Sequence, residues 1–142
     1  MEEKDLMNVL AGGNPLKTVM AMNRNTAQFG LTLTEADAKL LLQKRSEELR
    51  KQQRVEFGEG ILPKLLFAFC DSAYIDQDNY VETMIRLQEI FYLYKNETMD
   101  KVSDDELLSF MREQFEEVCC GDLEYLEGTC LYRFAEKIRA SV

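Results

Sequence analysis

The sequence predicts an all-α protein, a compact helical bundle of about five main helices with one or two short helices at the N-terminus. Apolar residues recur every three or four positions through most of the chain, which is the period of an amphipathic helix. Strand-like alternation of apolar and polar residues is rare. Because only two prolines and seven glycines interrupt the 142 residues, we expect one domain spanning residues 1–142.

The N-terminal part predicts short helices. Apolar residues over 6–10 have helical spacing and stop at two glycines, 12–13, which would end a short helix. Asn14 followed by Pro15 is typical of an N-cap and a first helical turn, so a second helix should begin there. Residues 23–33 have no clear period and could include a short extended stretch at their end.

Two helices are expected in the middle of the chain, over residues 34–54 and 61–71. Thr34 can cap the first helix, and Asp37 adds a favourable negative charge to its first turn. Two glycines break this helix, and Pro63 then allows a new one within its first turn. The second helix is apolar almost without interruption, so we expect it to be buried on most sides.

A loop at residues 71–79 precedes a strongly predicted helix over 79–95. This helix has apolar stripes on two sides, so it should contact neighbours on both of them. We therefore place it, together with the helix over 61–71, at the centre of the bundle.

Two more helices complete the expected bundle, over residues 104–120 and 122–140. Ser103 opens the first with a capping box, in which a glutamate stands at the third helical position. Gly121 is a suitable left-handed stop for that helix. Gly128 should weaken the middle of the last helix.

The chain has no histidine. Histidine is the usual general base and the commonest metal ligand in proteins. Its absence excludes serine or cysteine nucleophiles paired with histidine, and also histidine-bearing zinc and di-iron sites. We find no catalytic, cofactor-binding or metal-binding motif, so no cofactor is expected, and the sequence does not decide whether the protein is an enzyme.

The net charge of −9 is unevenly distributed, with −2 on residues 1–96 and −7 on residues 97–142. A negative field repels nucleic acid and anionic lipid, so we expect neither nucleic acid nor a membrane as partner. The most apolar segment, ten residues over 61–70, is far shorter than the ~20 residues that a membrane helix needs. A solvated acidic surface explains the charge, and attraction to a basic protein partner is the alternative.

The four cysteines, Cys70, Cys119, Cys120 and Cys130, lack the paired spacing of a zinc site. We expect Cys119 to be packed and Cys120 to be exposed at a helix end, with no bound metal. The first residues are acidic and contain no long apolar stretch, so no signal peptide is expected. A reducing cytoplasm fits this cysteine usage best.

Five residues in and around the 71–79 loop are the candidate partner-binding surface: Asp71, Tyr74, Asp76, Asp78 and Tyr80. Tyrosine offers a large contact area and a polar tip, and the loop carries no basic residue. Core packing with an outward hydroxyl is the alternative for the two tyrosines. Asp76 and Asp78 also resemble the start of a calcium-binding loop, but the required glycine and final glutamate are missing, so we expect helix capping there.

Arg45 is a separate candidate, because it lies in line with Leu41, Leu42 and Leu49 on the apolar face of its helix. Two arrangements are open: a buried ion pair with a carboxylate from another helix, or a packed stem with the charged head in water. If Arg45 lined a cavity without a neutralising carboxylate, it would instead anchor a ligand.

Four stretches together resemble a family of uncharacterised bacterial proteins, a domain of unknown function. They are RVEFG at 54–58, FCDSAY at 69–74, EIFYLYKNE at 89–97 and SDDEL at 103–107. The resemblance covers residues 29–127. It implies a bacterial, cytoplasmic, helical domain and supplies no activity, substrate or catalytic residue.

The leading hypothesis is a non-enzymatic cytoplasmic protein-interaction or regulatory module that binds a protein partner or associates with itself. The alternative is a small-ligand-binding bundle, or an enzyme, that uses Arg45 and carboxylates in its interior. The first predicts an exposed apolar and aromatic patch. The second predicts an enclosed pocket with convergent polar groups.

Overall fold

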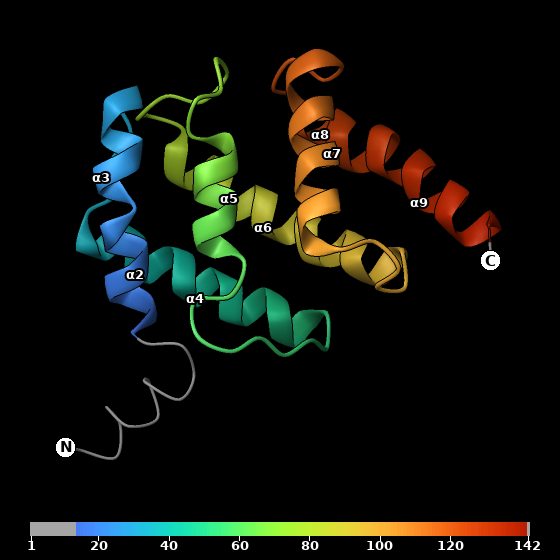
Figure 1. Cartoon of the computed structure of the whole chain (residues 1–142), viewed down its shortest axis with the longest axis horizontal. Helices are drawn as coiled ribbons and strands as arrows, with labels where there is room; N and C mark the ends of the chain where they lie inside the picture. Colours follow the sequence, from blue (N-terminus) through green and yellow to red (C-terminus); the bar gives the residue numbers. More distant parts are fainter. Residues whose placement is uncertain (1–13, 142) are drawn as a thin grey trace.

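The computed structural model describes residues 14–141, which form helices joined by loops and contain no β-strand. The predicted all-α class is therefore confirmed, while the short helix predicted at residues 6–10 lies outside the described part. In Figure 1 three short columns stand side by side. They are α2 with α3 (Pro15–Ala21 and Asn23–Thr26), α5 (Leu62–Phe69) and α7 (Asp104–Glu117).

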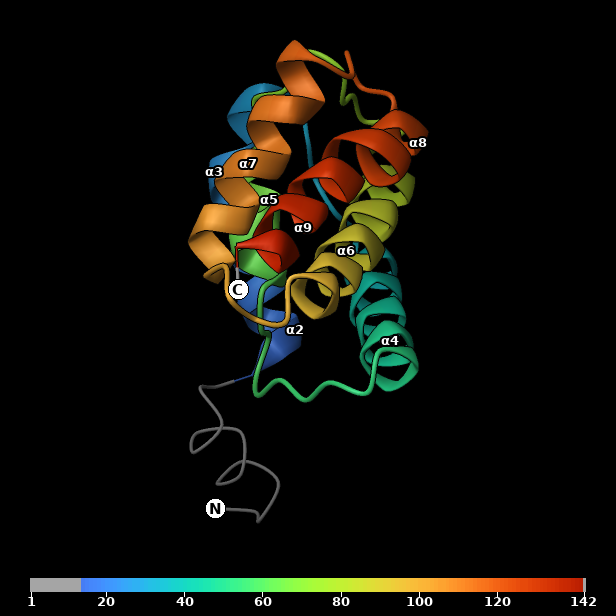
Figure 2. The same ribbon diagram turned by 90° about the vertical axis from the view of Figure 1, so that its right-hand side faces the viewer.

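A second layer lies behind these columns. It consists of α4 (Glu35–Lys51) and α6 (Tyr80–Glu97), and the turned view in Figure 2 separates the two layers. Helix α6 contacts α4, α5, α7 and the last helix, α9 (Leu131–Ala140). Its predicted central position is confirmed, because apolar side chains on more than one of its sides are buried.

The helix starts follow the capping residues of the sequence. Thr34 accepts a hydrogen bond from the backbone of Asp37, and the carboxylate of Asp37 accepts one from the backbone of Thr34, which completes a capping box. Ser103 accepts from the Glu106 backbone at 3.2 Å, but the Glu106 carboxylate bonds the Ser103 hydroxyl. The capping box predicted at Ser103 is therefore only half formed.

The segment after α3 contains a 3-10 turn, η1 (Ala27–Phe29), and then an extended stretch without a partner strand. Two amide side chains take the place of such a strand. Asn23 both donates to and accepts from the backbone of Leu33, and Gln77 does the same for Thr32. The buried side chains of Leu31 and Leu33 are thereby held in the core.

The predicted last helix is not continuous. A short helix, α8 (Leu123–Tyr125), leads into one π-helical turn, η2 (Leu126–Cys130), before α9 begins. Gly128 lies in the middle of the π turn, and Gly121 has the left-handed conformation predicted for it, with φ +85°. No helix among residues 14–141 is long and apolar enough to span a membrane.

Helix α5 corrects one expectation. Four of its side chains face the core with relative exposures of 0%: Leu62, Leu65, Leu66 and Phe69. Phe67 does not follow that stripe and is 61% exposed. The apolar run therefore has one face in solvent, because residues at positions i, i+3, i+4 and i+7 occupy only one side of a helix.

Candidate functional site

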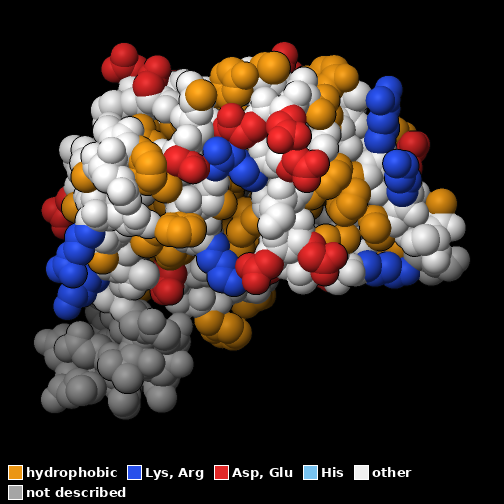
Figure 3. All heavy atoms as spheres, turned by 45° about the horizontal axis from the view of Figure 1, so that its top comes forward, with side chains coloured by type: hydrophobic (Ala, Val, Ile, Leu, Met, Phe, Trp, Pro, Cys, Tyr) orange, Lys and Arg blue, Asp and Glu red, His pale blue; other side chains and the backbone are white. Residues whose placement is uncertain are grey.

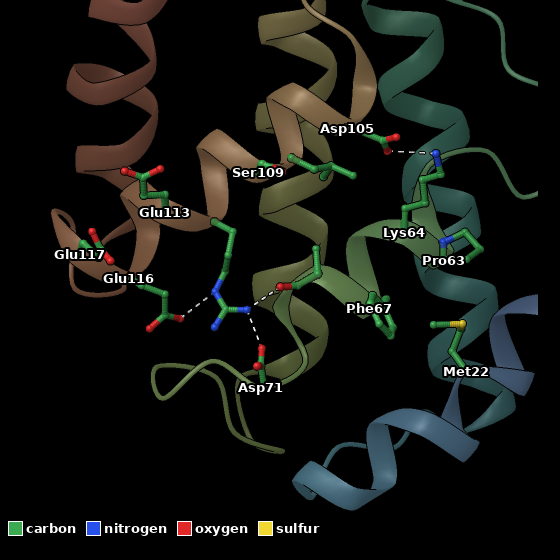
Figure 4. A pocket seen from close by; sticks show the side chains of 13 residues that line it. Met22, Pro63, Lys64, Phe67, Asp71, Asp105, Ser109, Glu113, Glu116 and Glu117 are labelled. Carbon is green, nitrogen blue, oxygen red and sulfur yellow. Dashed lines mark hydrogen bonds and ion pairs between the residues drawn. The ribbon is translucent and has the colours of Figure 1, made fainter.

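A groove of about 930 Å³ lies over α5 and α7. Pro63, Lys64 and Phe67 of α5 form its floor, and a face of α7 forms one wall. Met22, at the junction of α2 and α3, stands on the opposite side (Figure 4). The lining residues of α7 run over 105–117, so this wall is roughly 18 Å long, or about three helical turns.

The floor of the groove is apolar except for Lys64 and is open to solvent. Phe67 is its most prominent side chain, and in Figure 4 it points into the space between α5 and the α2–α3 junction at Met22. A second hollow of about 430 Å³ shares Phe67 and Arg112 with the groove. It extends the apolar surface to Phe29, which is 47% exposed.

Arg112 links the α7 wall of the groove to the C-terminal end of α5. Its guanidinium donates to the carbonyl oxygen of Ala68 and to Asp71 Oδ1, the latter at 2.6 Å, and its Nε lies 3.3 Å from Glu116 Oε1 (Figure 4). The hydrogen bond from Arg112 holds the pKa of Asp71 below its usual range. These charges are neutralised by one another and do not converge on a vacant centre.

The groove has an acidic rim. Five carboxylates and two cations line it, a net charge of −3. Glu113 and Glu117 are exposed on α7 and take part in none of the ion pairs found among residues 14–141. Figure 3 shows acidic side chains across the middle of the molecular face with apolar side chains between them.

The predicted partner-binding residues are only partly brought together. Asp71 lines the groove, whereas Asp76 and Asp78 are exposed in the loop before α6. Asp76 Oδ1 accepts a hydrogen bond from the backbone of Asn79 at 3.0 Å, within the turn that precedes α6, whereas the start of α6 itself has no side-chain cap. Tyr74 is 40% exposed and does not line the groove.

Tyr80 is the clear correction among these five residues. Its side chain is fully buried at the start of α6, so it cannot contact a partner at the surface. Its hydroxyl makes no hydrogen bond of normal geometry within the described part of the chain, although an interaction with the Thr26 side chain opposes the rise in its pKa. Burial raises the pKa of Tyr80 to about 12.

Arg45 is buried and forms an ion pair with Glu56, with 2.9 Å between Nε and Oε1. Glu56 comes from the connection between α4 and α5, not from another helix. The hydroxyl of Tyr92 donates to the same carboxylate oxygen at 2.5 Å. Arg45 lines none of the three hollows described for residues 14–141, so the condition for a ligand anchor is not met.

The cysteines behave as small buried side chains, with one exception. Cys119 and Cys130 are buried with 3.5 Å between their sulfur atoms, and Cys120 is exposed. Burial raises the pKa of the Cys119 thiol to about 12. Over the described range, no three cysteine, aspartate or glutamate side chains are grouped so that they could hold a metal ion.

Sequence reasoning missed the groove residues Lys64, Phe67, Arg112, Glu113 and Glu117. One signal could have found Phe67, which is the aromatic side chain off the core stripe of α5. The pairing of α5 with α7 has no such signal, because residues 44 and 41 positions apart provide the bonds from Arg112.

The fold and the groove define a small all-α protein with an open, partly apolar groove and an acidic rim. The chain belongs to DUF6323, a family of unknown function, which matches residues 18–142. A search of curated proteins and a search of solved structures each found no match. The expected membership in an uncharacterised family is thus confirmed.

Proposed function

We propose that this protein is a non-enzymatic cytoplasmic interaction module and that the groove over α5 and α7 docks a protein partner. The observation that carries the proposal is Phe67, an aromatic side chain 61% exposed on the floor of a groove with a charged rim. Protein interfaces combine an apolar centre with a polar rim. Large aromatic side chains near the centre commonly supply most of the binding energy.

The competing ligand-binding function has less support. An enclosed site would gather polar groups around an empty centre. In the groove, Lys64 pairs with Asp105, and Arg112 pairs with Asp71 and Glu116. In the interior, Glu56 already neutralises Arg45. Four free cysteines suit a reducing compartment, which supports the cytoplasmic location.

The test compares three forms of the full-length protein as bait in extracts of the native cells: the wild type, Phe67→Glu and Tyr132→Glu. Tyr132 is the matched control, because it is an aromatic residue 51% exposed on α9, outside the groove lining. Both substitutions place a charge on the surface, so circular dichroism should show a folded protein in each case.

We expect a stoichiometric partner that the wild type and Tyr132→Glu retain and that Phe67→Glu loses. Equal retention by all three baits would place docking outside the groove. The absence of any stoichiometric partner, together with a metabolite that raises the melting temperature of the wild type, would favour the ligand-binding alternative.

A further inference from the structure

The groove is long enough to hold one more helix and has helices on two sides. Helix α5 contacts α2 and α3 on one side and α7 on the other, so its exposed face lies between two helical walls. A segment of about three turns laid over Phe67 would match the roughly 18 Å wall of α7. Within residues 14–141 no strand edge is present to pair with an extended peptide, so the surface favours a helix.

The acidic rim of the groove favours a helix that carries positive charge. Asp71, Asp105 and Glu116 are occupied by Lys64 and Arg112. Glu113 and Glu117 are not, and they lie one turn apart on the exposed flank of α7. A bound helix with lysine or arginine along one flank would give both carboxylates a partner and offset the net −3 of the groove.

Charge also argues against two other occupants. Residues 1–13 of this chain carry three acidic residues and one basic residue, so the acidic rim repels them. A second copy brings a net charge of −9, most of it in the C-terminal third. Like charges oppose both contacts and favour a cationic partner.

We infer that the docked segment is a cationic amphipathic α-helix of about three turns, an inference that rests on the proposed function. Its apolar side chains, at positions i, i+3 or i+4, and i+7, pack on Phe67 and the adjoining floor. Its basic flank faces Glu113 and Glu117. The partner class is thus a protein that exposes a basic amphipathic helix.

The experiment selects binders from a phage library of random peptides of roughly 16 residues, long enough for three turns with flanks. The wild-type protein is the target, and clones that also bind Phe67→Glu are removed. We expect the remaining peptides to have helical apolar spacing and an excess of lysine and arginine. Their affinity should fall about fivefold in Glu113→Gln/Glu117→Gln, as expected for the loss of two exposed charge pairs.

The matched control is Glu82→Gln/Glu136→Gln, which removes the same charge from exposed positions outside the groove lining. Its affinity for the peptides should stay within about twofold of the wild-type value, because interactions between distant exposed charges are largely screened at moderate salt. Phe67-dependent peptides that are neutral, acidic or without helical spacing would overturn the partner class and leave the docking role intact. If no peptide depends on Phe67, both the partner class and the docking role fall.

Discussion

Arg45 in α4 and Glu56 in the α4–α5 connection form a buried ion pair, with 2.9 Å between Nε and Oε1. Arg45 Nη2 is also buried and has no hydrogen-bond partner among the described residues. The guanidinium therefore depends on Glu56 for its neutralisation. Because Tyr92 donates to the same oxygen, this carboxylate ties the connection to both α4 and α6.

Removal of Glu56 should be costly. Glu56→Ala leaves a buried, uncompensated charge on Arg45, so we expect a loss of roughly 3 kcal/mol in the free energy of unfolding. Urea denaturation measures it. The control is Glu35→Ala, which breaks an exposed pair with Lys39 and should cost about 0.5 kcal/mol or less. Equal losses in the two variants would contradict the buried role of Glu56.

Gly60 should tolerate no side chain. It has φ +59°, and a Cβ there would lie 1.9 Å from Glu56 Oε1 and 2.7 Å from Arg45 Nη2. Gly60→Ala should therefore cost about 2 kcal/mol or more, because it combines backbone strain with displacement of the ion pair.

Gly30 is the matched control for this substitution. It has φ +81° with nothing within 4 Å of an added Cβ, so Gly30→Ala should cost only the backbone strain, about 1 kcal/mol. Thermal unfolding of both variants checks the difference. A smaller loss for Gly60→Ala than for Gly30→Ala would be inconsistent with the packed ion pair.

Two buried tyrosines should respond in opposite ways to loss of the hydroxyl. Tyr80 has an unpartnered hydroxyl, so Tyr80→Phe should keep or raise stability, by up to about 1 kcal/mol. Tyr92 donates to Glu56, so Tyr92→Phe should cost about 1–2 kcal/mol. Chemical denaturation at neutral pH measures both. A destabilised Tyr80→Phe would reveal a hydrogen bond that this geometry does not contain.

The pH dependence of unfolding gives a second measurement on Tyr80. Burial favours the neutral phenol and raises its folded-state pKa from 10 to about 12. The stability that this contributes is complete below pH 10 and is lost as the pH rises towards 12. Tyr80→Phe should therefore lose less stability over that interval than the wild type. Identical pH profiles would contradict the burial of an ionisable group.

Cys119 and Cys130 should form a disulfide under a thiol oxidant at alkaline pH, because 3.5 Å separates their sulfur atoms and burial keeps the Cys119 thiol protonated near neutral pH. The bond would close a short loop and could add up to about 3 kcal/mol to stability by constraining the unfolded chain. Mass spectrometry of a Cys120→Ser background should show a loss of about 2 Da within one molecule. Cys70→Ser should leave this reaction unchanged. If every disulfide that forms joins two molecules, the observed proximity of Cys119 and Cys130 is contradicted.

The sequence predicted the helices because their signals are local. Thr34 with Asp37 and Ser103 act within one turn of the chain, and the structure begins a helix after each of these caps. Helix α7 ends at Glu117, four residues before the left-handed Gly121. The π turn around Gly128 was not predictable. It is only five residues long, too short for its period to be told apart from that of an α-helix.

The groove was beyond sequence reasoning for a different reason. It depends on which helices pack together, and a single chain's periodicity does not specify that. Arg112 reaches residues more than forty positions away, and Arg45 finds its carboxylate in a connection and not on a helix. Tyr80, the first residue of α6, shows the same limit, because its burial comes from packing between elements that are distant in sequence.

The connection between α4 and α5 places its polar side chains inward and its apolar ones outward. Arg54 bonds Asp100 and Glu56 bonds Arg45, while Val55 and Phe57 are 82% and 79% exposed. This strap enters α5 just before Pro63, the first floor residue of the groove. A genetic screen for lost binding would therefore also find substitutions of residues that hold this connection in place. Such substitutions would lower the melting temperature, whereas substitutions of contact residues in the groove would not.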